Sequence, residues 1–342
     1  MPNRFLSWLP CFTRNRTSPQ PVLVLAALLL AVTAALGQDE MADWLDPRLG
    51  QLQTSLSYDV EHHEQQSVRD SSEQMGPLFQ EMSFSLPLFQ NEKRELGLTV
   101  GYERADFNTG ADFPDSEEDF PEIYEDYTLA FAYRQWLTSE RQIGVMAQIG
   151  SPSDDPYDSF DDIAIDVNAM YRQNASGRDA WSFLVNFSTN RGWLNYIPLP
   201  GVAYSLSREK VQALIGIPIN MVRWQPTKQS SLLATYIPAR NINVRAGYEI
   251  AQPIEVYTGF SWENRSYFRA NRQDDDNRVE FYSKKVTGGI AWEVNESFTV
   301  DFRAGYAFDR FVFEGEDYED RNRDRIEFSD GPFYGVRGKV KF

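Results

Sequence analysis

The 342-residue chain has little of several features that define common classes of protein. It has one cysteine and two histidines, and 33 Lys+Arg stand against 50 Asp+Glu, for a formal net charge of −17. This acidic balance argues against a nucleic-acid binder, whose footprint is basic. A mean hydropathy of −0.48 argues against a set of helical spans, each of roughly 20 apolar residues. The aromatic content of 14% is too high for a disordered acidic chain.

The one long apolar stretch lies near the N-terminus. Arg4, Arg14 and Arg16 precede an apolar segment over residues 22–36, which is followed by Gly37. A basic start, an apolar centre and small residues before a cut are typical of a secretory signal peptide. An uncleaved anchor is the alternative, but a true span needs roughly 18 or more apolar residues. We predict a signal peptide over 1–37, a short segment over 38–50 and a single domain over 51–342. Cleavage removes Cys11, so disulfides and thiolate ligands are not expected.

Beyond residue 50 the dominant pattern has a period of two. Apolar and polar residues alternate over residues 52–60 and 96–103, and the pattern recurs many times up to the C-terminus. Alternate side chains of a strand point to opposite faces, so each segment has one apolar and one polar face. No helical period competes with this pattern, and we therefore predict an all-β fold.

The alternation is compatible with a soluble β-sandwich, but a membrane barrel is the better interpretation. The segments run for roughly 8–16 residues, which is long enough for a tilted membrane strand. Aromatic residues lie near the segment ends, where interfacial girdles are expected; examples are Tyr58, Trp136, Trp181, Trp262 and Trp292. We predict a transmembrane antiparallel up-and-down β-barrel.

Loop lengths orient this predicted barrel. Short connections fall at 90–94, 139–141, 174–178 and 295–297, and long ones at 61–76, 105–122, 151–161, 267–277 and 314–325. Short periplasmic turns and long external loops are typical of outer-membrane barrels. The last segment resembles the C-terminal signal read by the β-barrel assembly machinery, and it carries Tyr334, Val336, Val340 and Phe342. We expect the outer membrane as location, with its lipid and lipopolysaccharide as surroundings.

The number of strands depends on how the middle of the chain is divided. Counting every alternating stretch gives an odd number, whereas bacterial single-chain barrels have even ones. Treating residues 189–210 as a loop gives 14 strands. Splitting residues 211–225 at Pro218 gives 16 strands, two of them very short. Because Val211 to Met221 form one continuous alternating face, we favour about 14 strands within a range of 12 to 16.

Four short motifs add a resemblance that covers most of the domain. They are Ile197–Tyr204 (IPLPGVAY), Trp262–Phe268 (WENRSYF), Phe281–Lys285 (FYSKK) and Gly305–Phe311 (GYAFDRF). Together they resemble a bacterial outer-membrane β-barrel family of uncharacterised function. This resemblance implies the fold and the location, and it implies no activity and no functional residue.

Residues that suggest catalysis or metal binding are few. His62 and His63 are adjacent, so only one of them can face a given site, and their neighbours Ser67 and Asp70 lie in a loop. We therefore expect no enzyme, no catalytic residue and no cofactor, although an outer-membrane hydrolase is a second alternative. Acidic clusters in the loops suit hard cations, but residues 320–325 lack the glycine and the twelfth-position Glu of an EF-hand. Solvated surface charge is the better interpretation of these clusters, and no metal site is predicted.

Charged residues on the inward face of the last strands are the most informative feature. If the apolar alternates face lipid, ten charged residues face the lumen: Arg245, Glu249, Glu255, Glu263, Arg265, Asp301, Arg303, Asp309, Arg337 and Lys339. They form either an ion-pair network that fills the barrel or a charged constriction that selects solutes. The segment with Trp193, Leu194, Tyr196 and Ile197 is a further candidate for an inward plug.

Three functions remain open at this stage. The leading hypothesis is a passive channel or transporter for small polar solutes, and no nucleic acid is expected as a partner. A non-conducting structural or surface-interaction barrel is the alternative, and its mark would be a lumen closed by side chains. A hydrolase is the third.

Overall fold

The computed structural model describes residues 48–116, 118–191, 194–237 and 241–342. The predicted signal peptide over 1–37 lies outside the described residues. Sixteen antiparallel strands form one closed sheet. In chain order they are β1 (Ser55–His63), β4 (Leu78–Gln90), β5 (Arg94–Asp106), β6 (Ile123–Trp136), β7 (Arg141–Gly150), β8 (Ala164–Asn174), β9 (Ala180–Ser188), β10 (Leu199–Ser207), β11 (Val211–Ile217), β12 (Asn220–Trp224), β13 (Ser230–Ile237), β14 (Asn241–Ala251), β15 (Ile254–Tyr267), β16 (Arg278–Asn295), β17 (Phe298–Gly315) and β19 (Gly331–Lys341).

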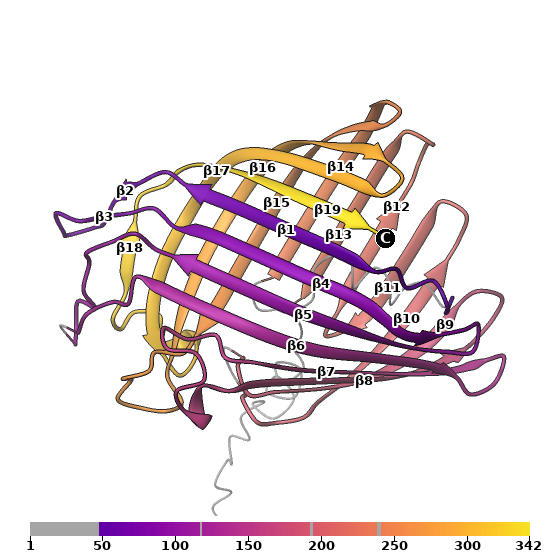
Figure 1. The fold of residues 1–342 in the computed structure, drawn as a ribbon, viewed down its shortest axis with the longest axis horizontal. Helices are drawn as coiled ribbons and strands as arrows, with labels where there is room; N and C mark the ends of the chain where they lie inside the picture. Colours follow the sequence, from indigo (N-terminus) through magenta and orange to yellow (C-terminus); the bar gives the residue numbers. More distant parts are fainter. Residues whose placement is uncertain (1–47, 117, 192–193, 238–240) are drawn as a thin grey trace, which may run out of the picture.

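The barrel closes between its first and last strands (Figure 1). β1 pairs with β4 on one side and with β19 on the other, from Ser55 opposite Lys341 to His63 opposite Phe333. Every strand therefore has two neighbours, and no strand edge is left along the closed sheet. Closure of this kind satisfies the backbone groups that a membrane cannot.

The outer face of the barrel is apolar. On β9, Trp181, Phe183 and Val185 are about half exposed, whereas Ser182 and Asn186 on the opposite face are buried. The alternation that the sequence shows is thus sorted into an apolar outside and a polar inside, as a membrane barrel requires. The protein is a transmembrane antiparallel β-barrel. Among the described residues, no helix is long and apolar enough to cross a bilayer.

Long loops gather at one end of the barrel and short turns at the other (Figure 1). The long loops carry the small elements β2 (Gln66–Ser67), β3 (Gln74–Met75), η1 (Phe160–Asp162), η2 (Tyr318–Asp320) and β18 (Ile326–Phe328). By the usual rule for such barrels, the end with the long loops is extracellular. Ser55 and Lys341 both lie at the end with the short turns, which is the periplasmic end.

The strand number is 16, within the expected range, and the favoured number of 14 is wrong. Residues 199–207, which that interpretation placed in a loop, form β10 between β9 and β11. The chain also turns at Pro218 and Ile219, so that Leu214 on β11 pairs with Met221 on β12. The apolar series is divided between two antiparallel strands. Ile215 and Ile217 on β11 face lipid, whereas Met221 on β12 faces the lumen with Leu214. Two short antiparallel strands cannot be told from one long strand by period alone.

The wall of the barrel varies in height. β16 and β17 have 18 residues each, whereas β11, β12 and β13 have 7, 5 and 8. The tall strands bring the extracellular loops together above the lumen. The short strands make the wall low on the far side of β14 and β15.

Candidate functional site

The lumen is the candidate site, and the registers of the strands show which predicted residues reach it. Arg337 lies opposite both Asp301 and Asp59, and Arg245 lies opposite Gly259 on the face that β15 shares with Glu263. The other face of these strands carries exposed apolar residues such as Phe302 and Val336. Nine of the ten predicted residues follow this inward register: Arg245, Glu249, Glu255, Glu263, Arg265, Asp301, Arg303, Arg337 and Lys339.

Asp309 departs from the prediction. At this position β17 has two residues opposite one on β16, because the register shifts between Tyr282 and Lys284. Asp309 adopts a left-handed backbone conformation, with φ of 53°. Its carboxylate accepts a hydrogen bond from Lys284, whose ammonium also lies 4.7 Å from the ring centre of Trp262. A bulge breaks the strict alternation on which the prediction depended, and Asp309 joins Lys284 on the outer face.

Two carboxylates of β1 form the centre of a buried charge network. Asp59 and Glu61 are 7% and 6% exposed. Arg303 donates to Asp59 at 2.5 Å and to Glu61 at 3.2 Å, and Arg337 donates to Asp59 at 2.6 Å. Lys285 completes the network with contacts of 2.7 Å to Glu61 and 2.8 Å to Glu263. We call these residues the central charge network.

Arg265 connects opposite parts of the barrel. It extends from β15 to Glu81 on β4 at 2.7 Å and to Glu103 on β5 at 2.6 Å. Four strands separate β15 from β4 around the sheet, so these ion pairs cross the lumen. The guanidinium also lies 4.3 Å from the ring centre of Phe79, and Tyr267 donates to Glu103 at 2.9 Å.

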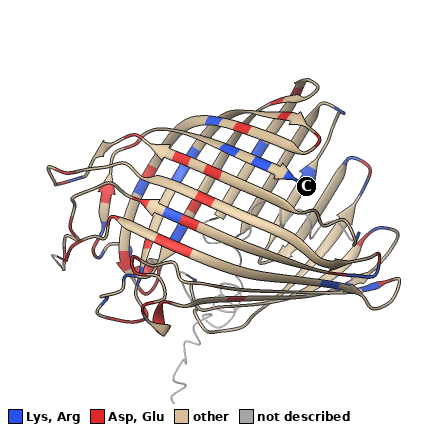
Figure 2. Ribbon diagram, in the orientation of Figure 1, with Lys and Arg blue, Asp and Glu red and all other residues tan. Residues whose placement is uncertain are grey.

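A second group of charges lies nearer the periplasmic end. Arg245 contacts Glu255 at 2.9 Å and Asp301 at 3.3 Å, and its guanidinium lies 3.4 Å from the ring centre of Tyr257. Tyr257 in turn donates to Asp301 at 2.6 Å. Figure 2 shows that basic and acidic positions lie side by side on neighbouring strands in this part of the barrel. The charges on the inner wall are therefore largely paired with one another.

An aromatic core fills the lumen above Arg265. It combines side chains of the strands with side chains of the extracellular loops, and all are buried: Val68, Met75, Phe79, Ala105, Phe107, Ala111, Phe113, Phe120, Tyr124, Tyr267, Val279, Phe281, Val312, Ile326 and Phe328. Phe107 is central, since its ring contacts those of Phe79, Phe120, Tyr124 and Phe281. We call this cluster the extracellular aromatic core; its side chains are buried as in the interior of a soluble protein.

The loops after β7 and β9 also help to close the extracellular end of the lumen. Phe268, at the end of β15, donates its backbone N–H to Pro152 at 2.7 Å, and Ala270 donates to Asp154 at 2.7 Å. Burial raises the pKa of the Asp154 carboxyl. Asn190 bonds to Ser266 through both its amide nitrogen and its carbonyl oxygen. These contacts join the loop after β7 and the loop after β9 to the upper end of β15.

The segment predicted as an inward plug, around Tyr196 and Ile197, is exposed at the surface. Tyr196 and Ile197 are 54% and 46% exposed, so these two apolar side chains are not packed into the lumen. Trp193 lies outside the described residues. Leu194 is half-buried beside them. The cover of the lumen comes from the extracellular aromatic core, which the sequence interpretation did not identify.

The two histidines point to opposite faces, as expected for neighbours in a strand. His63 is buried against Phe333, and its Nε2 lies 3.0 Å from Glu61. His62 lies on the outer face, with its ring 5.1 Å from that of Tyr334. Glu61 also binds Lys285 and Arg303, so His63 is part of a structural network. That the protein is no enzyme stays a prediction.

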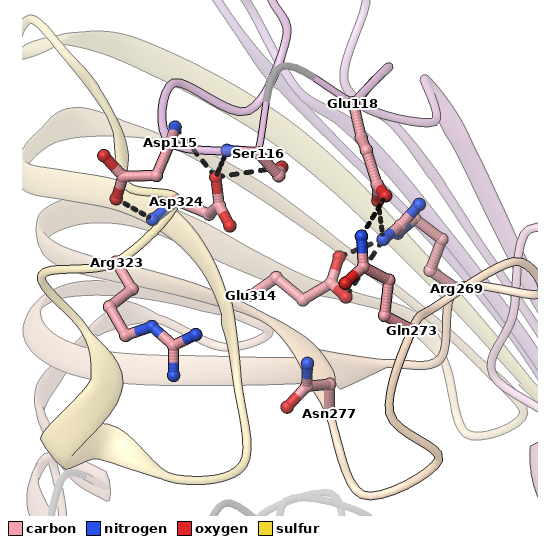
Figure 3. A pocket seen from close by; sticks show the side chains of 9 residues that line it. All are labelled: Asp115, Ser116, Glu118, Arg269, Gln273, Asn277, Glu314, Arg323 and Asp324. Atoms are coloured by element: carbon pink, nitrogen blue, oxygen red, sulfur yellow. Dashed lines mark hydrogen bonds and ion pairs between the residues drawn. The ribbon is translucent and has the colours of Figure 1, made fainter.

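The extracellular loops enclose a cavity of about 270 Å³ (Figure 3). Arg269 donates to both Glu118 and Glu314 on one side of it. On another side, the carboxylate of Asp324 accepts bonds from the backbone N–H groups of Asp115 and Ser116. Hydrogen bonds from Gln273 and Arg269 lower the pKa of Glu118. Within the described part of the chain, no three His, Cys, Asp or Glu side chains converge as a metal site would require.

The predicted assembly signal lies on β19. Tyr334, Val336 and Phe342 are 49%, 44% and 76% exposed, and the backbone N–H of Phe342 donates to Thr54 at 2.9 Å. These side chains and Val340 follow the outward register of β19. Recognition by the assembly machinery, like contact with lipopolysaccharide, stays a prediction.

The sequence pattern did not identify five charged residues of the inner wall. Asp59, Glu61, Glu81 and Glu103 lie on β1, β4 and β5, outside the last strands to which the prediction was confined. Lys285 lies on the inward register of β16. The period of two places Asp59 and Glu61 on the polar face of β1. Only the closure of the barrel brings that face to Arg303 and Arg337.

Comparisons with known proteins add little beyond the general architecture. No family model matches the chain, and no curated protein matches it. Among solved structures, it is similar to an outer membrane channel from Pseudomonas putida F1 (11% identity, 87% of this chain and 98% of that one, TM-score 0.37). It is also similar to the P. putida toluene transporter TodX (9%, 87% and 90%, 0.39) and to the translocator domain of the autotransporter NalP from Neisseria meningitidis (10%, 88% and 92%, 0.33). Nothing that these proteins carry is transferred to this chain.

Proposed function

We propose that the protein is a passive transport barrel for small polar solutes, with a lumen closed at its extracellular end. The observation that carries this proposal is a contrast between the two ends of the inner wall. Toward the extracellular end, inward residues such as Phe79, Tyr124 and Phe281 are at most 3% exposed. Toward the periplasmic end, several inward side chains of β1, β4, β5 and β6 are short and partly exposed. Below them Arg134 forms an ion pair with the buried Glu95, which also accepts the backbone N–H of Gly50 at 2.7 Å.

These short residues follow one another around the wall. Ser57 pairs with Ser83, and Thr99 lies opposite both Ser85 and Ala130. Ala132, next to them, is exposed. A barrel of 16 strands is wide enough for an aqueous channel, and side chains of this size do not fill it. A polar, accessible vestibule on the periplasmic side is what passage of a small polar solute needs.

A non-conducting structural barrel is the second candidate. The ion pairs of Arg265 across the lumen and the extracellular aromatic core favour it, because both close the axial route by side chains. A transporter needs these contacts to separate for a solute to pass. A structural barrel keeps them, and its ion pairs then serve only to hold the wall together.

Single-channel recording on the refolded protein in planar bilayers separates the two. The test compares the wild type with a triple variant, Arg265→Ala, Phe107→Ala and Phe281→Ala, which removes the bridge and the centre of the aromatic core. We expect rare or small openings in the wild type and frequent stepwise conductance in the variant. Arg245→Ala, which leaves the extracellular end intact, is the matched control. A variant that folds, by heat-modifiable migration, and still seals the bilayer at all voltages overturns the transport proposal.

A further inference from the structure

The low part of the wall is too short to span the hydrocarbon core of a membrane. β12 has five residues, which extend over about 17 Å at 3.3 Å per residue and over less when the strand is tilted. The apolar band of a membrane barrel is about 25 Å tall. β11 and β12 are joined by Pro218 and Ile219 alone, so no loop of this hairpin rises above the turn.

Beside the turn, both faces of this low wall are mainly apolar, while Gln212 on β11 and Arg223 on β12 lie on the same lumen face nearer the periplasmic end. On the lipid side, Ile215 and Ile217 are 57% and 42% exposed. On the lumen side, Met221 and Ile237 pack with Leu214, Ile219 and Leu233. Leu214 and Met221 face each other across β11 and β12. The inner wall is thus mainly apolar beside the turn and becomes polar again at Gln212 and Arg223, two residues nearer the periplasmic end.

The turn at Pro218 joins the two apolar faces. The alternating series that begins with Ile215 and Ile217 on the lipid side continues with Ile219 in the turn and Met221 on the lumen side. An apolar molecule that moves over the turn therefore exchanges one apolar contact for the next. Between Ile217 and Met221 it meets no charged side chain.

We infer that the β11–β12 hairpin is the sill of a lateral port, through which a small apolar solute dissolved in the outer leaflet reaches the lumen. The solute is apolar because five aliphatic or thioether side chains line the sill: Leu214, Ile219, Met221, Leu233 and Ile237. The bilayer is its source, because the sill lies within the depth of the hydrocarbon core. This route is separate from the axial route and does not depend on the conductance proposed above.

Cysteine labelling tests the port, because Cys11 is the chain's only cysteine. In a Cys11→Ser background, Met221→Cys places a thiol on the lumen side of the sill. Met170→Cys is the matched control, because Met170 lies on the inward register of β8. Met170 is 6% exposed and Met221 is 2% exposed. Each variant is reconstituted in phosphatidylcholine vesicles and treated either with N-pyrenylmaleimide, which partitions into the bilayer, or with a sulfonated, water-soluble maleimide.

We expect the pyrenyl reagent to label the Met221→Cys variant several-fold faster than the Met170→Cys variant, and Ile219→Asp to reduce this advantage by placing a charge at the sill. Ile290→Asp, at an outward position far from the sill, tests whether a charge elsewhere has the same effect. Equal labelling rates of the two thiols with the pyrenyl reagent overturn the proposal. So does preferential labelling of the Met221→Cys variant by the water-soluble reagent, because it shows an aqueous opening. A sealed bilayer in single-channel recordings leaves the expected labelling unchanged, so the two proposals fail separately.

Discussion

Arg303 on β17 binds both carboxylates of the first strand, Asp59 at 2.5 Å and Glu61 at 3.2 Å. β19 lies between β17 and β1 in the sheet, so this one side chain reaches over the last strand to the first. The closure of the barrel thus depends on ion pairs as well as on backbone hydrogen bonds. Arg337 on β19 strengthens the same seam through Asp59.

Replacement of Arg303 by methionine is expected to destabilise the barrel by about 3–5 kcal/mol, because it leaves two buried carboxylates with fewer partners. Urea unfolding of the protein refolded into vesicles measures the change. Arg69→Met is the control, since the Arg69–Glu327 pair is exposed and is worth about 0–1 kcal/mol. In the triple variant with Asp59→Asn and Glu61→Gln, part of the lost stability returns. Equal loss in the single and triple variants would contradict this account.

Two glycines on neighbouring strands offer a matched test of packing. A Cβ at Gly305 on β17 would lie 2.1 Å from the carbonyl oxygen of Val286 and 2.7 Å from the ring of Phe333. A Cβ at Gly288 on β16 meets only the carbonyl oxygen of Tyr257, at 3.9 Å. We expect Gly305→Ala to cost about 1–3 kcal/mol through overpacking and Gly288→Ala to fold as well as the wild type. Unfolding midpoints in urea compare them, and similar midpoints would refute the predicted clash.

The sequence predicts local features of this fold well and contacts between distant strands poorly. The alternation is a property of each strand, so the outward and inward faces of β14 to β19 follow from it, apart from the bulge at Asp309. The partners of Arg265 do not, since Glu81 and Glu103 lie more than 160 residues away. The turn at Pro218 and the bulge at Asp309 could not be predicted for the same reason. Each changes the direction or the register of the backbone without interrupting the hydrophobic pattern of the sequence. The extracellular aromatic core was missed because Phe107 and Phe113 lie in loops without a period.

Docking of the loop after β7 is expected to weaken as the pH rises. Asp154, outside the membrane-spanning strands, accepts a hydrogen bond from the backbone N–H of Ala270 at 2.7 Å, and burial raises the pKa of its carboxyl above the ordinary value of 3.8. A group whose pKa is raised in the folded state contributes stability below its unfolded pKa and loses it as the pH rises through the folded pKa.

Hydrogen exchange at residues 268–270 measures this docking. After correction for intrinsic exchange, protection should be higher at pH 4 than at pH 7. Asp154→Asn retains a carbonyl acceptor and does not titrate, so protection in this variant should be independent of pH. A wild-type protein with the same protection at both values would show that Asp154 does not control the contact.

The outward face of β16 is expected to tolerate no charge at mid-depth. Ile290 is 47% exposed and lies opposite Phe302 on the lipid-facing register of β17. Arginine at a lipid-facing position near the midplane costs about 2–4 kcal/mol and near the interface about 0–1. Ile290→Arg should therefore lower the free energy of unfolding in vesicles by that larger amount. Phe160→Arg, at a loop position that is 90% exposed, should leave the free energy unchanged. If both substitutions are equally mild in vesicles, the outer face of β16 does not contact the hydrocarbon core.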